Sequence, residues 1–202
     1  MHLYISKISE LIEKYDKNHK YSSLTLNRIK KTGVLKRENE LKAIELLISI
    51  LFDDVSAFTF SVSKNGKPSV NEYGLKFSYS HSQDLLFLQT AYQEEVGADV
   101  QFISGQAKKV SRAFLNDDEL KYADSDLLFT VLWTIKESII KKYDSLLFMV
   151  KNIHIIDLKK EDDEYVSTCT FLGEEIIVRS KLYENFVLSY TSKEKLELIY
   201  KN

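Results

Sequence analysis

Two segments of this chain repeat apolar residues at helical spacing, and short strand-like segments surround both of them. Intervals of three and four residues place such side chains on one face of a helix. We therefore expect long helices over residues 37–52 and 126–143, and a shorter one over residues 116–123 that Asn116 and Glu119 can cap. The apolar positions are Leu41, Ile44, Ile48 and Leu51 in the first long segment and Leu128, Leu132, Ile135 and Ile139 in the second.

Alternating and apolar runs outside these helices predict β-strands. Turns are expected at residues 65–68 and 172–174, where glycine occurs. Each half of the chain holds one long helix and several short strands, which predicts an α+β fold with a junction near Glu94. The predicted strands cover residues 57–63, 77–80, 85–92, 95–102, 153–158, 165–171, 175–179 and 186–190.

The composition excludes several classes of protein. Lys and Arg total 28 against 30 for Asp and Glu, a net charge of −2 at pH 7, so no overall basic field would hold nucleic acid or an anionic membrane. Charge-free stretches such as residues 127–135 are about half as long as a membrane span requires, and no export signal precedes them. The single cysteine, Cys169, excludes an internal disulfide. We expect a cytoplasmic protein without nucleic-acid or membrane partners.

One predicted strand carries oxygen ligands on a single face. Asp99 and Gln101 are two residues apart and project together, while Ala98 and Val100 point into the core. Oxygen ligands suit a hard cation such as Mg²⁺. Gly97 permits the close approach of another backbone or a ligand. The alternative is an ordinary exposed polar face of an amphipathic strand.

The second long helix carries a carboxylate and an ammonium group one turn apart. Glu137 and Lys141 lie on the same helical face. A surface ion pair is one interpretation. A functional pair is the other, because Glu137 lies between Ile135 and Ile139, next to the apolar face, and Trp133 precedes it by one turn.

Several groups are suited to binding a phosphate. His81 follows a strand and is flanked by serines, so it can donate to a phosphate oxygen, although a locally satisfied turn histidine is the alternative. Cations also gather before the first long helix and around the turn at Gly66, either as solvated loop charge or as a cluster for a phosphate monoester. These cations are Arg28, Lys30, Lys31, Lys36, Arg37, Lys64 and Lys67.

Taken together and in this order, five segments resemble the surfactin-synthetase-activating (Sfp-like) class of the 4'-phosphopantetheinyl transferase superfamily. The last segment matches the family's Trp-x-x-Lys-Glu-x-x-x-Lys pattern in full, and the order and spacing agree over about residues 28–142. The segments are Gly66-Lys67-Pro68, Ser80-His81-Ser82, Gly97-Ala98-Asp99-Val100-Gln101, residues 114–119 in a looser alignment, and Trp133 with Lys136, Glu137 and Lys141.

The resemblance implies a pseudo-twofold, two-lobed α+β monomer with coenzyme A bound between the lobes, which would be residues 1–94 and 95–202. Such an enzyme transfers the 4'-phosphopantetheine arm to a serine of an apo acyl or peptidyl carrier protein and releases adenosine 3',5'-bisphosphate. The metal would be Mg²⁺, with Mn²⁺ as a second candidate.

The resemblance also implies roles for single residues. Asp99, Gln101 and Glu137 would be the metal ligands, and Glu137 would be the base for the carrier serine. Lys141 would act in catalysis with Asp99 and Glu137 and would hold the diphosphate. The coenzyme A ligands would be Arg28, Lys31, Arg37, Lys67, Pro68, Ser80, His81 and Lys141.

The sequence departs from the family pattern at two places. Gln101 stands where the family usually has a second acid, so we expect weaker metal binding. Residues 142–144 lack the glycine that tends to follow the helix in the family. A coenzyme A-binding homologue without efficient turnover is therefore one alternative. A metal-dependent nuclease is another, although its usual Glu-x-Lys spacing and a strongly basic surface are absent.

A further segment is a candidate surface for the carrier protein. It is basic and then apolar, and an acidic helix could dock there. An ordinary amphipathic segment is the alternative. The residues concerned are Lys108, Lys109, Arg112, Phe114 and Leu115.

Overall fold

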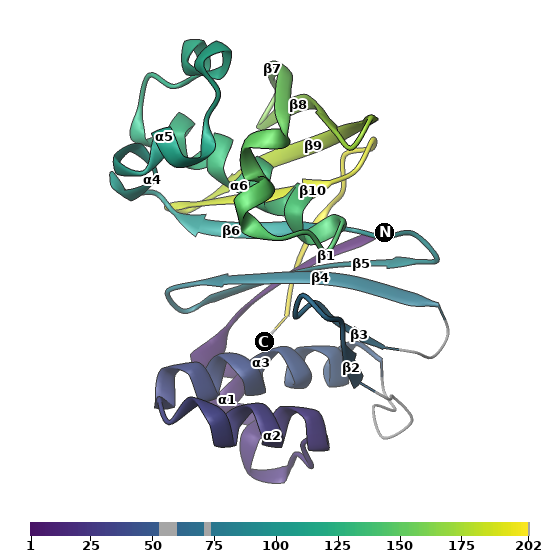
Figure 1. The fold of residues 1–202 in the computed structure, drawn as a ribbon. Helices are drawn as coiled ribbons and strands as arrows, with labels where there is room; N and C mark the ends of the chain where they lie inside the picture. The colour runs from purple at the N-terminus through teal and green to yellow at the C-terminus, as the bar shows by residue number, and fades with distance from the viewer. Residues whose placement is uncertain (53–59, 71–73, 202) are drawn as a thin grey trace.

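A computed structural model describes residues 1–52, 60–70 and 74–201 of the chain (Figure 1). It has the mixed α+β architecture that the sequence predicts. The helices are α1 (Ile8–Tyr15), α2 (Ser23–Thr32), α3 (Leu35–Leu51), α4 (Gln106–Lys109), α5 (Ser111–Phe114) and α6 (Asp126–Lys142), with 3₁₀ helices at Asp16–Asn18, Asp117–Tyr122 and Leu147–Asn152. The strands are β1 (His2–Lys7), β2 (Phe60–Val62), β3 (Pro68–Val70), β4 (Leu75–Ser82), β5 (Leu85–Tyr92), β6 (Ala98–Phe102), β7 (His154–Glu161), β8 (Glu164–Phe171), β9 (Glu174–Tyr183), β10 (Phe186–Thr191) and β11 (Leu198–Tyr200).

The two long helices, α3 and α6, form where the apolar periodicity predicts them, to within two residues at each end. The Ser125 hydroxyl caps α6 by accepting a hydrogen bond from the Leu128 amide. The apolar face of α6 is buried, with Leu132, Ile135 and Ile139 fully inaccessible. Most of the stability of each helix therefore comes from packing rather than from helix propensity.

The helix expected over residues 116–123 is instead a 3₁₀ helix, Asp117–Tyr122. Its predicted capping box is present, since the Asn116 amide donates to Glu119 and the Asn116 side chain accepts from the Glu119 amide. Glu119 also binds the ammonium of Lys136 and the amide of Ile155. These long-range partners hold the Glu119 carboxylate, and the segment stays a short turn instead of an α-helix.

The strands form a four-stranded sheet in the order β11-β1-β5-β4, a five-stranded antiparallel sheet in the order β6-β10-β9-β8-β7, and a hairpin of β2 and β3. The predicted strand at residues 57–63 is seen only as β2, because residues 57–59 lie outside the described ranges. The strand predicted from residue 95 begins at Ala98. The predicted turn at residues 172–174 is present, with Leu172 and Gly173 at positive φ.

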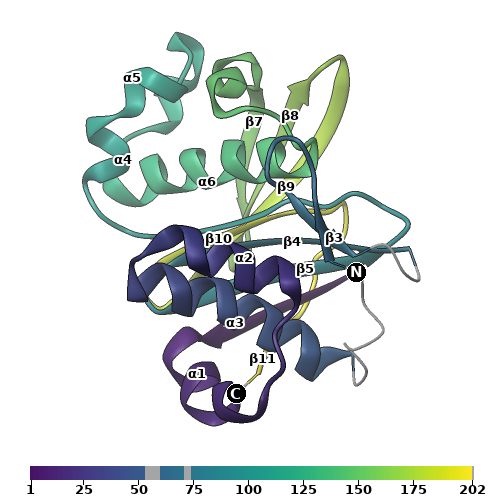
Figure 2. The ribbon, with the colours of Figure 1, turned by 60° about the horizontal axis from the view of Figure 1, so that its bottom comes forward.

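The two larger sheets meet along their edge strands β4 and β6. Helices α1–α3 cover one side of the molecule, α4–α6 lie on the other, and strands separate them (Figures 1 and 2). The division at residue 94 stays a prediction. The strand β11 crosses it, because it belongs to residues 95–202 but pairs in parallel with β1 of the first half.

Other predictions concern packing and membrane insertion. Cys169 is fully buried in the core, as its place in a predicted strand indicates. Within the described residues, no helix has the length and apolar character that a membrane crossing requires.

Candidate functional site

Gly97 lets strand β6 lie directly against helix α6. A Cβ atom at this position would overlap the carbonyl oxygen of Ser138 and would lie 2.7 Å from the amide nitrogen of Lys142. The predicted close approach at Gly97 is therefore that of the α6 backbone. This contact brings the side chains of β6 and the second half of α6 to the same place.

Asp99 occupies the centre of this contact and is almost completely buried. The ammonium of Lys141 lies 2.6 Å from its Oδ1 atom. The hydroxyl of Ser80, on β4, donates to the same oxygen at 2.7 Å. Ala98 and Val100, on the opposite face of β6, are buried in the core as predicted. Asp99 therefore holds together three elements that are distant in sequence.

Glu137 lies close enough to Asp99 for their charges to interact. Burial and, to a smaller extent, the negative charge of Asp99 together raise the pKa of Glu137 to about 7, while Lys141 acts in the opposite direction. The predicted partners Glu137 and Lys141 do share a helical face, but the ion pair of Lys141 is with Asp99. The site thus combines two neighbouring carboxylates with one ammonium group.

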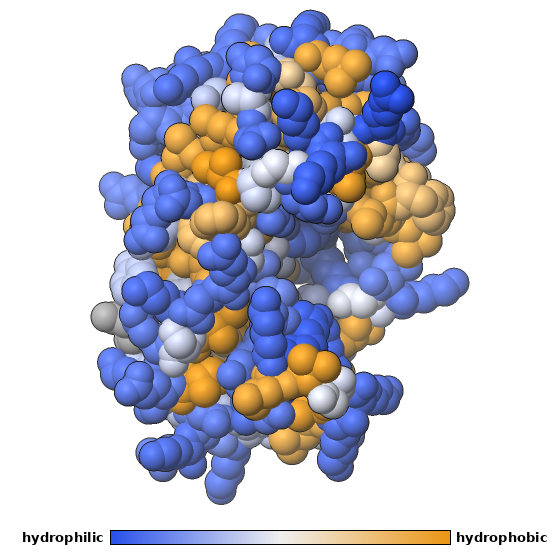
Figure 3. Space-filling model, turned by 90° about the vertical axis from the view of Figure 1, so that its left-hand side faces the viewer, coloured by the Kyte–Doolittle hydropathy of each residue, from blue (hydrophilic) through white to orange (hydrophobic). Residues whose placement is uncertain are grey.

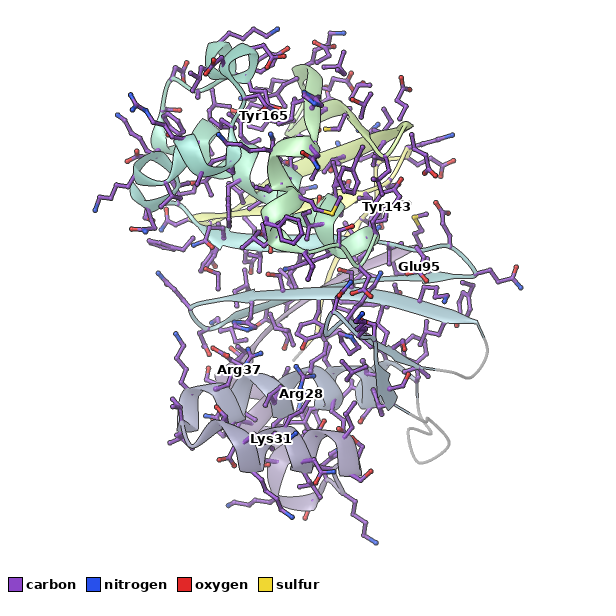
Figure 4. The ribbon with its side chains drawn as sticks, viewed as in Figure 1. Arg28, Lys31, Arg37, Glu95, Tyr143 and Tyr165 are labelled. Carbon is purple, nitrogen blue, oxygen red and sulfur yellow. The ribbon has the colours of Figure 1, made fainter. Side chains whose placement is uncertain are left out.

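A cavity of about 270 Å³ lies next to Lys141. Seven of the eight predicted coenzyme A ligands line it: Arg28, Arg37, Lys67, Pro68, Ser80, His81 and Lys141. The surface is hollowed and mostly hydrophilic between the two halves (Figure 3). Lys31 is the exception, because it is exposed and absent from this lining, and it lies farther from β4 than Arg28 and Arg37 do (Figure 4).

His81 belongs to a small charged cluster at one end of this cavity. The Arg37 guanidinium lies 2.9 Å from His81 Nε2 and 2.9 Å from the carboxylate of Glu40, which itself lies 3.4 Å from His81. Burial lowers the pKa of His81, and the charges of Arg37, Lys141 and Lys36 lower it further, whereas Glu40 opposes them. Sequence reasoning missed Glu40, although it follows Arg37 by three residues on one helix.

The turn of the β2–β3 hairpin forms another wall of the cavity. Lys67 lies 2.7 Å from the carboxylate of Glu95 and donates to the carbonyl oxygens of Val96 and Lys142. The Asn65 side chain donates to the carbonyl oxygen of Asp144. These contacts fasten the hairpin to the second half of the chain. Asp144 has a φ of 50°, which explains why a glycine would be favoured just after α6.

Gln101 is two residues from Asp99 on the same face of β6 and lines a separate cavity of about 220 Å³ together with Trp133 and Thr130 of α6. Among the described residues, no group of three or more His, Cys, Asp or Glu side chains is arranged to hold a metal ion. Asp99 and Glu137 offer carboxylates whose charges interact, whereas Gln101 lines the separate cavity. A divalent cation fits the two carboxylates, because it would offset the charge of Asp99, which adds to the effect of burial on the pKa of Glu137.

One prediction about the second half is wrong, and one residue there has a role that the sequence analysis did not assign. Phe114 and Leu115 do not form an apolar surface for a partner, because both are buried in the core beneath α6. Lys136, which was noted only as part of the motif, is fully buried and binds Glu119 at 2.6 Å and the carbonyl oxygens of Phe114 and Ile153. Its place on the apolar face, four residues after Leu132, was the signal for this role.

Positive charges around a cavity, beside two carboxylates and an ammonium group, define a site suited to a phosphorylated ligand and a divalent cation. Residues 95–191 match the family model of the 4'-phosphopantetheinyl transferase superfamily. That segment contains Asp99, Gln101, Glu137 and Lys141, whereas Arg28, Arg37, Lys67 and His81 lie outside it. A search of curated proteins finds no match.

Proposed function

We propose that this protein transfers the 4'-phosphopantetheine arm of coenzyme A to a serine of an acyl or peptidyl carrier protein and releases adenosine 3',5'-bisphosphate. The observation that carries the proposal is that Lys141 and Ser80, which line the positively charged cavity, both contact the Asp99 carboxylate, whose charge also acts on Glu137. The match of residues 95–191 to the transferase superfamily supports the same reaction.

The nucleotide end of coenzyme A would bind among the residues of the first half. Arg28 and Arg37 would meet the 3'-phosphate, because a guanidinium matches the geometry of a phosphate monoester. His81 lies beside Arg37 and would donate to the same group once it is protonated. Lys67 and Pro68, on the hairpin wall of the cavity, would lie against the adenine.

The diphosphate would lie toward Lys141, which borders the cavity and contacts Asp99. Asp99, Gln101 and Glu137 would hold Mg²⁺ or Mn²⁺, which would supply positive charge for the diphosphate oxygens. Lys141 would neutralise part of the charge that develops on the leaving phosphate. The single negative charge lost at Gln101 would weaken the cation's affinity without removing a donor atom.

Glu137 would act as the base. It lies one helical turn before Lys141, which borders the cavity. The carrier serine would give its proton to Glu137, directly or through one water, while its oxygen forms a bond to the phosphorus that bears the pantetheine. The bond from that phosphorus to the bridging oxygen breaks, and the electron pair leaves with adenosine 3',5'-bisphosphate.

The finer features of the family belong to the same proposal. Two helices of 17 residues, α3 and α6, each pack against a different sheet, a mixed one for α3 and an antiparallel one for α6. This supports a pseudo-twofold arrangement of two lobes and membership of the surfactin-synthetase-activating class. The lobes would be residues 1–94 and 95–202. The monomeric state and the cytoplasmic location stay predictions.

Incubation with apo carrier protein, coenzyme A and Mg²⁺ tests the proposal by mass spectrometry of the carrier. We expect the mass of one phosphopantetheine to be added and adenosine 3',5'-bisphosphate to appear in equal amount. Glu137→Gln should keep the fold, measured by circular dichroism, and lose the transfer. If several acyl and peptidyl carriers stay unmodified while a known transferase modifies them, the proposed reaction is wrong.

Gln101→Glu separates an efficient enzyme from a coenzyme A-binding homologue without efficient turnover. A large increase in rate would indicate that the metal site of the natural chain is impaired. If transfer by the natural chain is already robust and Gln101→Glu leaves it unchanged, the chain is not a coenzyme A-binding homologue without efficient turnover. Calorimetry of coenzyme A binding to both variants controls for a change in ligand affinity.

A further inference from the structure

Alternate serines on the edge strand β4 hold the neighbouring edge strand β6 through their side chains. Ser78 accepts a hydrogen bond from the amide of Ala98 at 2.9 Å, and Ser82 accepts one from the amide of Phe102 at 3.0 Å. These contacts satisfy backbone groups of β6 on the side where it has no strand neighbour of its own sheet. The two sheets are therefore joined by hydroxyl groups along this edge.

Ser80, between these two serines, makes a different contact. Its hydroxyl donates to a side chain, the Oδ1 atom of Asp99, at 2.7 Å. Lys141 donates to the same oxygen at 2.6 Å. Both donors therefore use one oxygen of the carboxylate, and Oδ2 is engaged by neither of them. Fixing Oδ1 from two directions also fixes the direction in which Oδ2 points.

Orientation matters at this position because the charges of the Asp99 and Glu137 carboxylates repel each other. The contact between Ser80 and Asp99 is buried on both sides, with Ser80 8% and Asp99 5% exposed, so water competes poorly for either group. A hydrogen bond to a charged group in such surroundings is stronger than one between neutral groups. Ser80 thus restrains the Asp99 side chain against this repulsion.

We propose that Ser80 is a positioning residue that orients the Asp99 carboxylate so that its second oxygen, Oδ2, faces a divalent cation. This inference rests on the proposed function, since it assumes that Asp99 is a metal ligand. It assigns Ser80 to the metal site rather than only to the coenzyme A cavity that it also lines. Hydrogen bonds that orient a ligand commonly change metal affinity by about 10- to 100-fold.

Titration of the ligand-free protein with Mn²⁺, followed by water-proton relaxation without coenzyme A, tests this role. We expect Ser80→Ala to weaken Mn²⁺ binding by about 10-fold or more. Ser80→Thr keeps a hydroxyl and should restore most of the affinity. Ser82→Ala is the matched control, because it removes the next hydroxyl of the same edge without touching Asp99, and it should bind Mn²⁺ within about two-fold of the natural chain.

The outcomes separate the two proposals. If the natural chain and Asp99→Asn bind Mn²⁺ equally, Asp99 is not a metal ligand, and both the metal site of the proposed function and the role of Ser80 are wrong. If Asp99→Asn loses the ion while Ser80→Ala binds like Ser82→Ala, the metal site stands and only the role of Ser80 is overturned. Thermal unfolding of each variant shows that an affinity change does not reflect loss of the fold.

Discussion

At the scale of single residues, the properties of the site centre on the protonation of Glu137. Its carboxyl is largely removed from water and lies beside the negative charge of Asp99, so its pKa rises from 4.5 to about 7. The folded protein therefore binds the Glu137 proton more tightly than the unfolded chain does. Linkage requires this difference to appear in the stability of the protein.

The free energy of unfolding should fall as pH rises from about 4.5 to about 7, because the unfolded chain releases this proton first. The loss attributable to Glu137 is about 3 kcal/mol at pH 8, on the basis of about 1.4 kcal/mol for each pKa unit. Glu137→Gln should remove this part of the pH dependence and be the more stable form at pH 8 in the absence of metal. Urea unfolding at pH 5 and pH 8, in the presence of a chelator, measures the difference. An identical pH dependence in the two proteins would contradict the raised pKa.

The sequence predicted which residues surround the site better than it predicted their partners. The i, i+4 spacing placed Glu137 and Lys141 on one face of α6, which is a local property of the helix. The partner of Lys141 is Asp99, which lies 42 positions away and reaches it only because β6 packs on α6. Glu40 was missed for the same reason, since its contact with His81 depends on the packing of α3 near β4.

At the scale of secondary-structure elements, the contact between β6 and α6 depends on the absence of a side chain at Gly97. Gly97→Ala should destabilise the protein by several kcal/mol or displace α6, because the new Cβ would meet backbone atoms that cannot move independently. Gly105→Ala is the matched control, since its Cβ would lie at ordinary contact distances from Asp126. Thermal unfolding of both variants provides the comparison, and equal melting temperatures would refute the close contact.

The buried pair of Lys136 and Glu119 joins α6 to the 3₁₀ helix Asp117–Tyr122. Burial lowers the pKa of Lys136, and Glu119 counteracts the shift. Lys136→Met should cost about 3–5 kcal/mol, because Glu119 is then left buried without a counter-charge. Lys121→Met, on the exposed side of the same 3₁₀ helix, should change the stability by less than about 0.5 kcal/mol.

Denaturant unfolding measures these differences. Adding Glu119→Gln to the Lys136→Met variant should recover part of the loss, since the uncompensated charge is then removed. A Lys136→Met protein as stable as the Lys121→Met control would show that the pair contributes little.

Periodicity predicted α3 and α6 because their apolar positions recur over several turns. The strand β1 and the helix α1 were not predicted, because β1 ends at Lys7 and α1 begins at Ile8 with no turn residue between them. The helix α2 has residues typical of helix ends, with Ser22 as its N-cap and Gly33 in the left-handed conformation after it. It was not predicted because only one of its residues is buried, so its apolar pattern is weak. β11 has three residues, too few for an alternating pattern.

At the scale of the whole molecule, the two halves are held together by the serine contacts between β4 and β6 and by the hairpin contacts of Lys67 and Asn65. None of these contacts follows from local sequence, because each joins positions whose proximity arises only from the complete fold. The sequence predicted an α+β protein. It did not predict that the two sheets meet along their edge strands β4 and β6, which is seen only in the folded structure.

Lys67→Met should loosen the β2–β3 hairpin, because it removes the contacts with Glu95 and with the carbonyl oxygens of Val96 and Lys142. Hydrogen exchange of the ligand-free protein should become faster over residues 63–70 and stay unchanged in α6. Lys64→Met alters an exposed lysine of the same turn and should leave the exchange rates as they are. Unchanged exchange in the Lys67 variant would mean that the hairpin is held by other contacts.

The parallel pairing of β11 with β1 also bears on how the protein is made. Tyr200 reaches back to the carboxylate of Glu10, 190 positions earlier, so the first sheet lacks its edge strand until ribosomal synthesis has passed residue 200. The amino-terminal half must therefore wait, partly assembled and with an open sheet edge, while the other half emerges. Contacts of such long range slow folding, and this open edge is exposed to pairing with other chains until the last strand arrives.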